Sequence, residues 1–124
     1  MTKKEATRLL RIYGKAWEKQ DPDLILTLFS EDASYKDPEE PENFGHEGIR
    51  KYWVSKVQGE QSSIHFKLLH VWADGDTVIA EWDAEFTDTK SNSRIQMTEV
   101  AILQIKGGKF SSLREYYKAT KIAL

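Results

Sequence analysis

Two polar residues of this 124-residue chain are candidates for acid–base chemistry on a small molecule. Asp37 precedes Pro38 in a stretch with two prolines and four acids, residues 37–43, which must be a loop. If its carboxyl group points back over a sheet into a cavity, loss of water raises its pKa and makes it a usable acid or base. The alternative is a solvated loop acid whose side chain stabilises a turn.

Tyr13 is the second candidate, because it lies on an apolar helical stripe one turn before Trp17. A buried phenol needs a hydrogen-bond partner and can donate its proton to a substrate oxygen. The alternative is a tyrosine that belongs to the hydrophobic core.

The sequence gives little support for thiolate, metal-dependent or phosphate-binding chemistry. The chain has no cysteine, so thiolate catalysis and disulfides are excluded. Its histidines show no spacing typical of a metal site, and Gly107-Gly108-Lys109 indicates a hairpin turn rather than a phosphate loop (the histidines are His46, His65 and His70). We therefore expect neither a metal nor a cofactor.

The amino-acid composition narrows the class of protein further. The formal charge is −2 with interspersed signs, which gives no electrostatic case for nucleic acid or anionic lipid. No apolar run reaches the roughly 18 residues that a membrane span needs. We expect one domain, residues 1–124, in a soluble cytoplasmic protein. Its 14 aromatic residues (four Trp, five Tyr and five Phe) can fill a core or line an apolar pocket.

Three helices are expected in the first half of the chain. The first follows Thr2, which forms a capping-box pair with Glu5, and its apolar face comprises Leu9, Leu10, Tyr13, Ala16 and Trp17. Asp21 and Pro22 begin a short second helix, whose buried stripe comprises Leu24, Ile25, Leu28 and Phe29. A brief strand at 33–35 precedes a third helix after Gly45, with Ile49, Tyr52, Trp53 and Val57 on its apolar face.

The second half has strand-like periodicity. Runs at 64–73, 77–87, 94–105 and 109–118 are separated by short polar or glycine-containing turns, which predicts an antiparallel meander. Alternation in the second run gives it one buried face: Val78, Ala80, Trp82, Ala84 and Phe86. Helices followed by strands are typical of the α+β class.

The segments described above resemble a known family. Residues 12–38, from Ile12-Tyr13 through Trp17 and Asp21 to Lys36-Asp37-Pro38, are similar to the start of bacterial ketosteroid isomerases and of the wider SnoaL-like polyketide cyclase family, within the nuclear-transport-factor-like superfamily. Gly48-Ile49-Arg50 with Tyr52-Trp53 resembles the third helix of that family, and 108–117 its last strand. The resemblance implies a cone: three helices packed on a strongly curved, mostly antiparallel sheet that encloses a pocket.

The resemblance also implies roles. Asp37 matches the general base of the isomerases and Tyr13 matches their oxyanion-binding tyrosine. The position of the second oxyanion donor corresponds to Ala101, which can donate nothing, and the supporting tyrosine corresponds to Trp53, whose indole N–H is a donor only. The missing donor removes an electrostatic contribution, which argues against ketosteroid isomerisation itself.

Strand alternation adds a further carboxyl group. If Ala101 faces the pocket, Glu99 shares its face, and the same alignment turns Glu115 and Tyr117 inward. Glu99 or Glu115 would then share the cavity with Asp37, and two nearby carboxyl groups push their pKa values apart. The alternative is a partly buried glutamate bonded to Arg114, a tyrosine or a backbone amide. The other expected ligand-contacting residues are Trp17, Phe29, Trp53, Trp82, Phe86 and Leu113.

Two functional classes remain open. The first is a cofactor-free isomerase or cyclase in which Asp37 moves a proton, Tyr13 binds an oxygen, and aromatic side chains hold an apolar carbonyl-bearing or ring-containing small molecule. The second is a non-catalytic ligand-binding or assembly protein with the same fold, where Asp37 only stabilises its loop.

The strand at 94–105 also suggests a homodimer. Val100 and Ile102 are apolar on the face opposite Ala101, Leu103 and Ile105, and the helices can cover only one face. A second copy of the chain would bury them symmetrically, and paired sheets are common in the family that this chain resembles. The alternative is that the C-terminal tail, with Ile122 and Leu124, folds over them.

Overall fold

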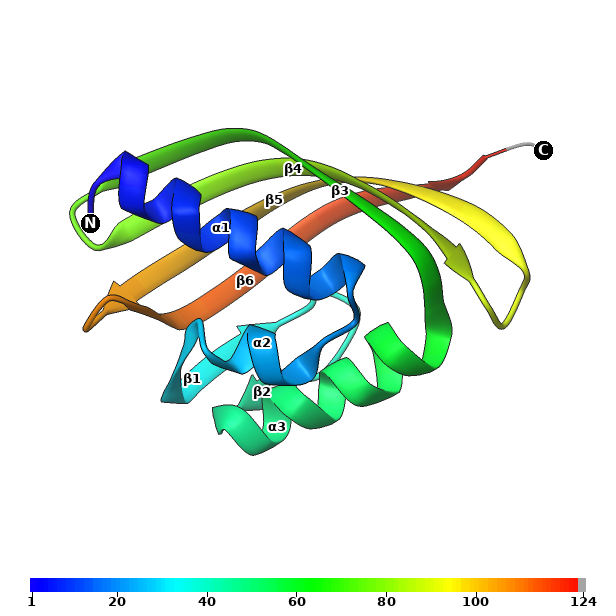
Figure 1. Cartoon of the computed structure of the whole chain (residues 1–124), viewed down its shortest axis with the longest axis horizontal. Helices are drawn as coiled ribbons and strands as arrows, with labels where there is room; N and C mark the ends of the chain where they lie inside the picture. The colour runs from blue at the N-terminus through cyan, green and yellow to red at the C-terminus, as the bar shows by residue number, and fades with distance from the viewer. Residues whose placement is uncertain (123–124) are drawn as a thin grey trace.

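The computed structural model describes residues 1–122, and its elements run in the order that the sequence predicts (Figure 1). Three α-helices lie in the first half: α1 (Lys3–Glu18), α2 (Pro22–Leu26) and α3 (Gly45–Tyr52), which continues as the π-helix η1 (Trp53–Gln58). Two short strands, β1 (Phe29–Lys36) and β2 (Asn43–Phe44), lie between α2 and α3. The remainder forms the long strands β3 (Gln61–Asp74), β4 (Thr77–Asp88), β5 (Ser93–Lys106) and β6 (Lys109–Lys121).

The first two helices begin at the caps expected from the sequence. Thr2 Oγ1 accepts a hydrogen bond from Glu5 N at 3.1 Å, while the Glu5 carboxylate pairs with Arg8. Asp21 Oδ1 accepts one from Leu24 N at 3.1 Å, with Pro22 in the first turn of α2.

The second helix is shorter than predicted, because the chain turns into a strand after Leu26. Phe29 was expected on the helical stripe but is the first residue of β1, and its ring packs on Phe110 with centroids 5.5 Å apart. Phe110 N also donates a hydrogen bond to Leu28 O. This pairing with a distant strand outweighs the local apolar spacing, which is compatible with either structure.

The six strands form one mixed, mostly antiparallel sheet in the order β2-β1-β6-β5-β4-β3. The strands β3 to β6 form the predicted meander, while β1 pairs with β6 in parallel, with Tyr35 opposite Leu113. Two register shifts in β3, between Ser62 and His65 and between Leu68 and His70, locally bend this edge strand. The α+β class is confirmed.

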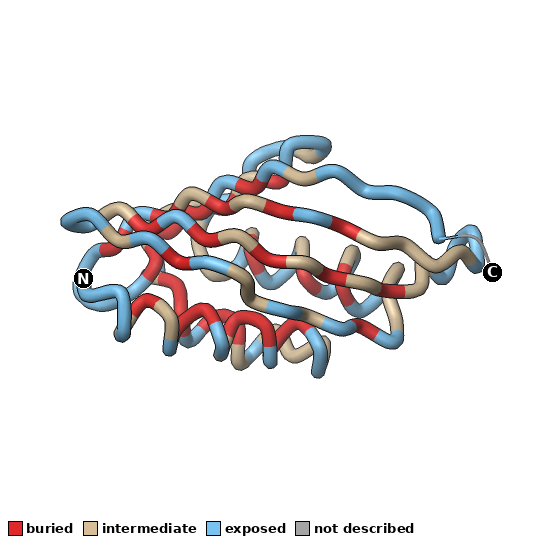
Figure 2. The backbone as a smooth tube through the Cα atoms, turned by 90° about the horizontal axis from the view of Figure 1, so that it is seen from above, coloured by how far each residue is buried: buried red, intermediate tan, exposed pale blue. Residues whose placement is uncertain are grey.

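The helices pack on one face of the sheet, and the core lies between these two layers. Figure 2 shows buried segments along α1 and along the parts of the strands that face it, whereas the hairpin turns are exposed. The alternating residues of β4 are buried there as predicted, with Val78, Ala80 and Trp82 fully inaccessible. Among residues 1–122, no helix is long and apolar enough to cross a membrane.

The opposite face of the sheet carries a row of apolar side chains. Trp72 pairs with Ile79 across β3 and β4, and Ile79 pairs with Ile102 on β5. Val100 pairs with Tyr116 on β6. Trp72 and Tyr116 are half-exposed. Val100 and Ile102 thus lie in an apolar band on this outer face; Leu124, part of the tail considered as a possible cover, lies outside the described residues.

Two helical glycines differ in the space around them. A Cβ atom added to Gly14 on α1 would lie 2.2 Å from the ring of Phe66, whereas one added to Gly48 on α3 would meet its nearest neighbour at 3.6 Å. Alanine favours a helix over glycine by about 0.5–1 kcal/mol. We therefore expect Gly14→Ala to destabilise the fold by about 1–3 kcal/mol, since the clash exceeds that gain, and Gly48→Ala to be neutral or stabilising. Urea unfolding followed by circular dichroism measures both, and equal stability of the two variants would contradict this packing of α1.

Candidate active site

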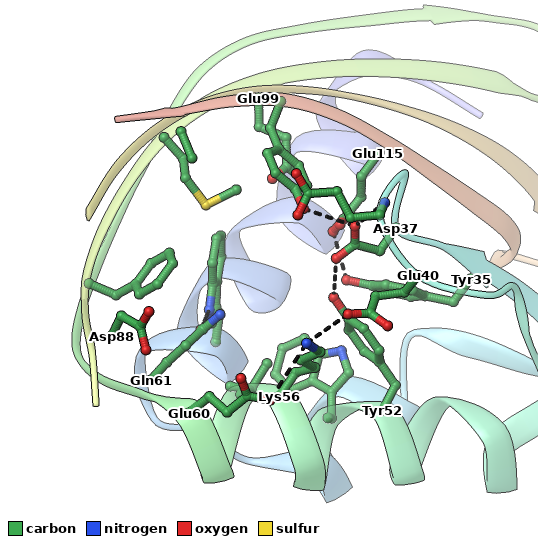
Figure 3. A pocket seen from close by; sticks show the side chains of 18 of the residues that line it. Tyr35, Asp37, Glu40, Tyr52, Lys56, Glu60, Gln61, Asp88, Glu99 and Glu115 are labelled. Atoms are coloured by element: carbon green, nitrogen blue, oxygen red, sulfur yellow. Dashed lines mark hydrogen bonds and ion pairs between the residues drawn. The ribbon is translucent and has the colours of Figure 1, made fainter. Parts of the chain in front are cut away.

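A cavity of about 240 Å³ lies between α1, the α3–η1 segment and the inner face of β4 to β6. Figure 3 shows carboxyl and phenol groups converging on it from several elements. Its described wall comprises Tyr13, Trp17, Tyr35, Asp37, Glu39, Glu40, Tyr52, Trp53, Lys56, Val57, Glu60, Gln61, Phe86, Asp88, Met97, Glu99, Glu115, Tyr117 and Ala119. Acidic and aromatic residues therefore dominate the wall.

Asp37 follows the last residue of β1 and is 7% exposed. Its Oδ2 accepts a hydrogen bond from Tyr52 Oη at 2.6 Å, and its Oδ1 accepts one from Tyr117 Oη at 2.9 Å. Oδ1 also accepts from Glu39 N at 2.9 Å, so the carboxyl group stabilises its turn while lining the cavity. Asp37 thus stabilises its turn, as the alternative interpretation expects, but it is buried against the cavity rather than solvated.

Glu115 forms a second carboxyl–tyrosine cluster deeper in the site. Its Oε1 accepts hydrogen bonds from Tyr35 Oη at 2.7 Å and from Tyr13 Oη at 3.1 Å, and the two phenol oxygens are 3.0 Å apart. Burial raises the pKa of Glu115 to about 7, with the bond from Tyr35 opposing the shift and the charge of Asp37 adding to it. A carboxyl group with such a pKa exchanges protons at neutral pH.

Glu99 on β5 is the least compensated acid of the site. It is 1% exposed, and its Oε2 has no hydrogen-bond partner among residues 1–122. Burial first, and then the neighbouring Glu115, raises the pKa of Glu99 well above its ordinary value. The site therefore disfavours the charged form of Glu99, and its titration is linked to that of the neighbouring Glu115.

The four tyrosines remain hydrogen-bond donors. Burial raises the pKa of Tyr13 and Tyr35 well above the usual value, and the charge of Glu115 adds to both shifts. Burial also raises the pKa of Tyr52 and Tyr117, which the contact with Asp37 raises further. Because these phenols keep their protons, each can stabilise a carboxylate.

The residues expected to contact a ligand fall into two groups. Trp17, Trp53, Phe86, Glu99 and Glu115 line the cavity, together with Asp37 and Tyr13. Phe29, Trp82 and Leu113 are fully buried in the core and are not among the described lining residues.

Sequence reasoning missed two phenols of the site. Tyr52 donates to Asp37, while the resemblance had assigned a supporting role to its neighbour Trp53, whose Nε1 is buried without a partner among residues 1–122. Helical periodicity does not separate two adjacent residues on one apolar face. Tyr35 could have been found by alternation, because it lies two residues before Asp37, which directly follows β1, and alternate residues of an extended chain point to the same side.

The position of the missing donor also has a structural counterpart. Ala101 is fully buried on β5 and pairs directly with Glu115 on β6. Two carboxyl groups therefore lie next to Ala101 on the same face of the sheet, that of its cross-strand partner Glu115 and that of Glu99, two residues earlier. Among the described part of the chain, no group of three acidic or histidine side chains is arranged to hold a metal ion.

The fold resembles solved structures of diverse function. An epoxide hydrolase/cyclase-like enzyme, SalBIII, involved in pyran ring formation in the polyether salinomycin, is 24% identical, with a TM-score of 0.77 and coverage of 90% of this chain and 89% of its own. An epoxide hydrolase of Mycobacterium tuberculosis described as LEH-like is 19% identical (TM-score 0.76; 94% and 84% covered). A protein with a ketosteroid isomerase-like fold from Catenulispora acidiphila, crystallised with trimethylamine, is 20% identical (TM-score 0.80; 89% and 85% covered). At these identities the likeness establishes the fold only.

Sequence comparison identifies the family more directly. No curated protein sequence matches this chain. The family model of the SnoaL-like domain, in contrast, matches residues 9–113, which contain both helices and strands that form the cavity. The chain belongs to the SnoaL-like domain family.

Proposed function

We propose that this protein is a small enzyme that performs cofactor-free acid–base chemistry, in the manner of an isomerase or a cyclase, on a small molecule bound in the cavity. The observation that carries the proposal is the enclosure of three carboxyl groups, Asp37, Glu99 and Glu115, in one aromatic cavity. Buried titratable groups with shifted pKa values cluster at catalytic sites more often than in ordinary cores.

The contacts suggest a division of roles. The carboxyl group of Asp37 accepts all three of its hydrogen bonds and donates none. In the proposed reaction it therefore acts as the acceptor that takes a proton from the substrate. Tyr13 donates a hydrogen bond to a substrate oxygen, which requires that its contact with Glu115 be exchanged for the substrate. Glu115, with a pKa of about 7, can return a proton to the product.

The second candidate is a non-catalytic ligand-binding protein. It is favoured by the hydrogen bond that the Tyr13 hydroxyl donates to Glu115, which engages Tyr13 with a carboxyl group of the protein itself. In that case the tyrosine–carboxyl contacts serve packing, and a ligand binds by shape and charge without reaction.

Substitution of the carboxyl group separates the two candidates. We expect Asp37→Asn to slow proton exchange at carbon atoms next to a carbonyl by about 10²-fold or more, because the proton acceptor is lost. NMR detection of deuterium incorporated from solvent into a panel of small ketones and aldehydes measures this rate. Folding should survive, or improve slightly, since a desolvated acid is removed.

The matched control is Asp32→Asn, the same change at an exposed position on β1. It should leave the exchange rate and the melting temperature unchanged. Equal exchange in the Asp37→Asn variant would assign Asp37 to the turn alone and favour the binding protein.

The raised pKa of Glu115 has a consequence for stability. The unfolded side chain titrates near 4.5, whereas the folded one titrates near 7. Between these values the folded state holds a proton that the unfolded state has released, so the contribution of Glu115 to stability falls as the pH rises from about 4.5 to 7. Glu115→Gln cannot release this proton, and its melting temperature should fall less than that of the wild type between pH 5 and 8.

Between pH 5 and 8 the free energy of unfolding of the wild type should fall by an amount on the order of a few kcal/mol more than that of Glu115→Gln. Calorimetry across that pH range measures this difference. Glu31→Gln, an exposed position on β1, is the control and should follow the wild type. Parallel curves for Glu115→Gln and the wild type would show that Glu115 is ionised at low pH and is not the neutral-pH proton carrier.

The apolar outer face supports the proposal that two copies pair through their sheets. Ile79 lies at the centre of the row formed with Trp72 and Ile102. We expect light scattering at micromolar concentration to give a mass near twice 14.3 kDa, and Ile79→Lys to shift it to the monomer because a buried charge opposes association. Val54→Lys on η1, an apolar position elsewhere that is 45% exposed against 37% for Ile79, is the control. A wild-type mass of one chain would overturn the dimer.

A further inference from the structure

The cavity wall is far more acidic than the chain as a whole. The sequence has 20 acidic residues against 18 lysines and arginines. Seven of the acids line the cavity, against Lys56 as the one cation of its described wall (the acids are Asp37, Glu39, Glu40, Glu60, Asp88, Glu99 and Glu115). A concave surface with charges of one sign concentrates ions of the other sign.

The nearby lysines are already engaged at the rim. Lys56 Nζ lies 2.7 Å from Glu40 Oε1 and 3.6 Å from Glu60 Oε2, and Lys90 Nζ lies 3.2 Å from Glu60 Oε1. Lys36 Nζ donates to the main-chain oxygens of Asp37 and Glu40. Asp37 and Glu115 are therefore held by neutral phenols rather than by cations. Figure 3 shows Lys56 beside Glu40 and Glu60.

Glu99 provides an independent indication of a ligand. Its side chain lines the cavity, is almost completely buried, and has one oxygen without a hydrogen-bond partner among residues 1–122. Leaving a buried acceptor unpaired costs about 1–3 kcal/mol. A positively charged ligand would compensate this oxygen and would also reduce the repulsion between the three inner carboxyl groups.

The aromatic residues of the wall favour a particular kind of cation. The ring of Tyr13 stands at 71° to Trp17 and at 84° to Trp53, with centroids 6.4 and 6.1 Å apart. Three rings that line the cavity therefore meet at steep angles. Aromatic faces attract organic ammonium groups, whose alkyl substituents also gain from leaving water.

We propose that the cavity binds a small organic cation, an alkylated ammonium group whose charge faces the inner carboxyl groups and whose alkyl substituents contact Tyr13, Trp17 and Trp53. The inference deepens the proposed function, since it concerns the ligand of the same site, but binding is measurable whether or not a reaction follows. A catalytic substrate would then carry this group next to the atoms that react.

Choline and its neutral carbon analogue, in which a tert-butyl group replaces the trimethylammonium group, test the proposal without any mutation. Their shapes are nearly identical and only the charge differs. Titration of each at pH 8, followed by calorimetry and by the fluorescence of the cavity tryptophans, should show millimolar or tighter binding of choline. The analogue should bind at least about tenfold more weakly. Equal affinities, or no binding of choline at millimolar concentration, would overturn the proposal.

The pH dependence provides a second readout, because choline does not titrate in this range. Binding should strengthen by up to about tenfold between pH 6 and 8, as Glu115 becomes ionised. The groups that face Glu115 are the phenols, which stay neutral, and two acids (Tyr13, Tyr35, Tyr52, Tyr117, Asp37 and Glu99). An affinity for choline that does not change with pH would contradict the assigned position of the charge.

Variants locate the site and separate this inference from the proposed reaction. Glu115→Gln and Asp37→Asn should each weaken choline binding, with folding verified by circular dichroism, whereas Asp32→Asn should leave it unchanged. Unchanged binding in both cavity variants would place the ligand elsewhere and overturn the inference. Binding of choline without proton exchange on any substrate would support the ligand class and overturn the proposed reaction. Proton exchange on neutral ketones without choline binding would support the reaction and overturn the ligand class.

Discussion

Three carboxyl groups enclosed without a basic partner are the constraint on which this structure depends. An acid that leaves water must find hydrogen bonds or give up its charge. Asp37 accepts hydrogen bonds from two phenols and an amide, Glu115 accepts them from two phenols, and burial disfavours the charged form of Glu99 by raising its pKa. The tyrosines therefore compensate buried carboxyl groups, as lysine or arginine does in a buried ion pair, without adding a positive charge to the cavity.

This compensation connects the elements of the fold. The four phenols come from α1, β1, α3 and β6, and their acceptors lie after β1 and on β6. A shift of any one of these elements would leave a carboxyl group without its donor at a cost of about 1–3 kcal/mol. The polar interior thus specifies how helices and sheet are placed, while the aromatic core supplies most of the stabilisation.

The features that could be predicted from the sequence are those with a strong local signal. Caps at Thr2 and Asp21, alternation in β4 and the glycine turn before β6 all predicted elements that are present. The end of α2 could not be predicted, because the strand that begins at Phe29 exists through pairing with a segment some 80 residues later. The inward position of Glu99 and Glu115 followed from alternation, but which phenol holds which acid depends on side-chain distances that spacing does not contain.

The parallel pairing of β1 with β6 also determines when the site can exist. Tyr35 and Asp37 are synthesised 80 residues before their respective partners, Glu115 and Tyr117. Contacts between such distant segments form late, since a long loop must be closed before they stabilise anything. Until β6 has been synthesised, the nascent chain therefore carries an incomplete sheet edge at β5 and unsatisfied acids. Loss of β6 would consequently remove Glu115 and Tyr117 from the cavity wall while the segments that form the helices remain.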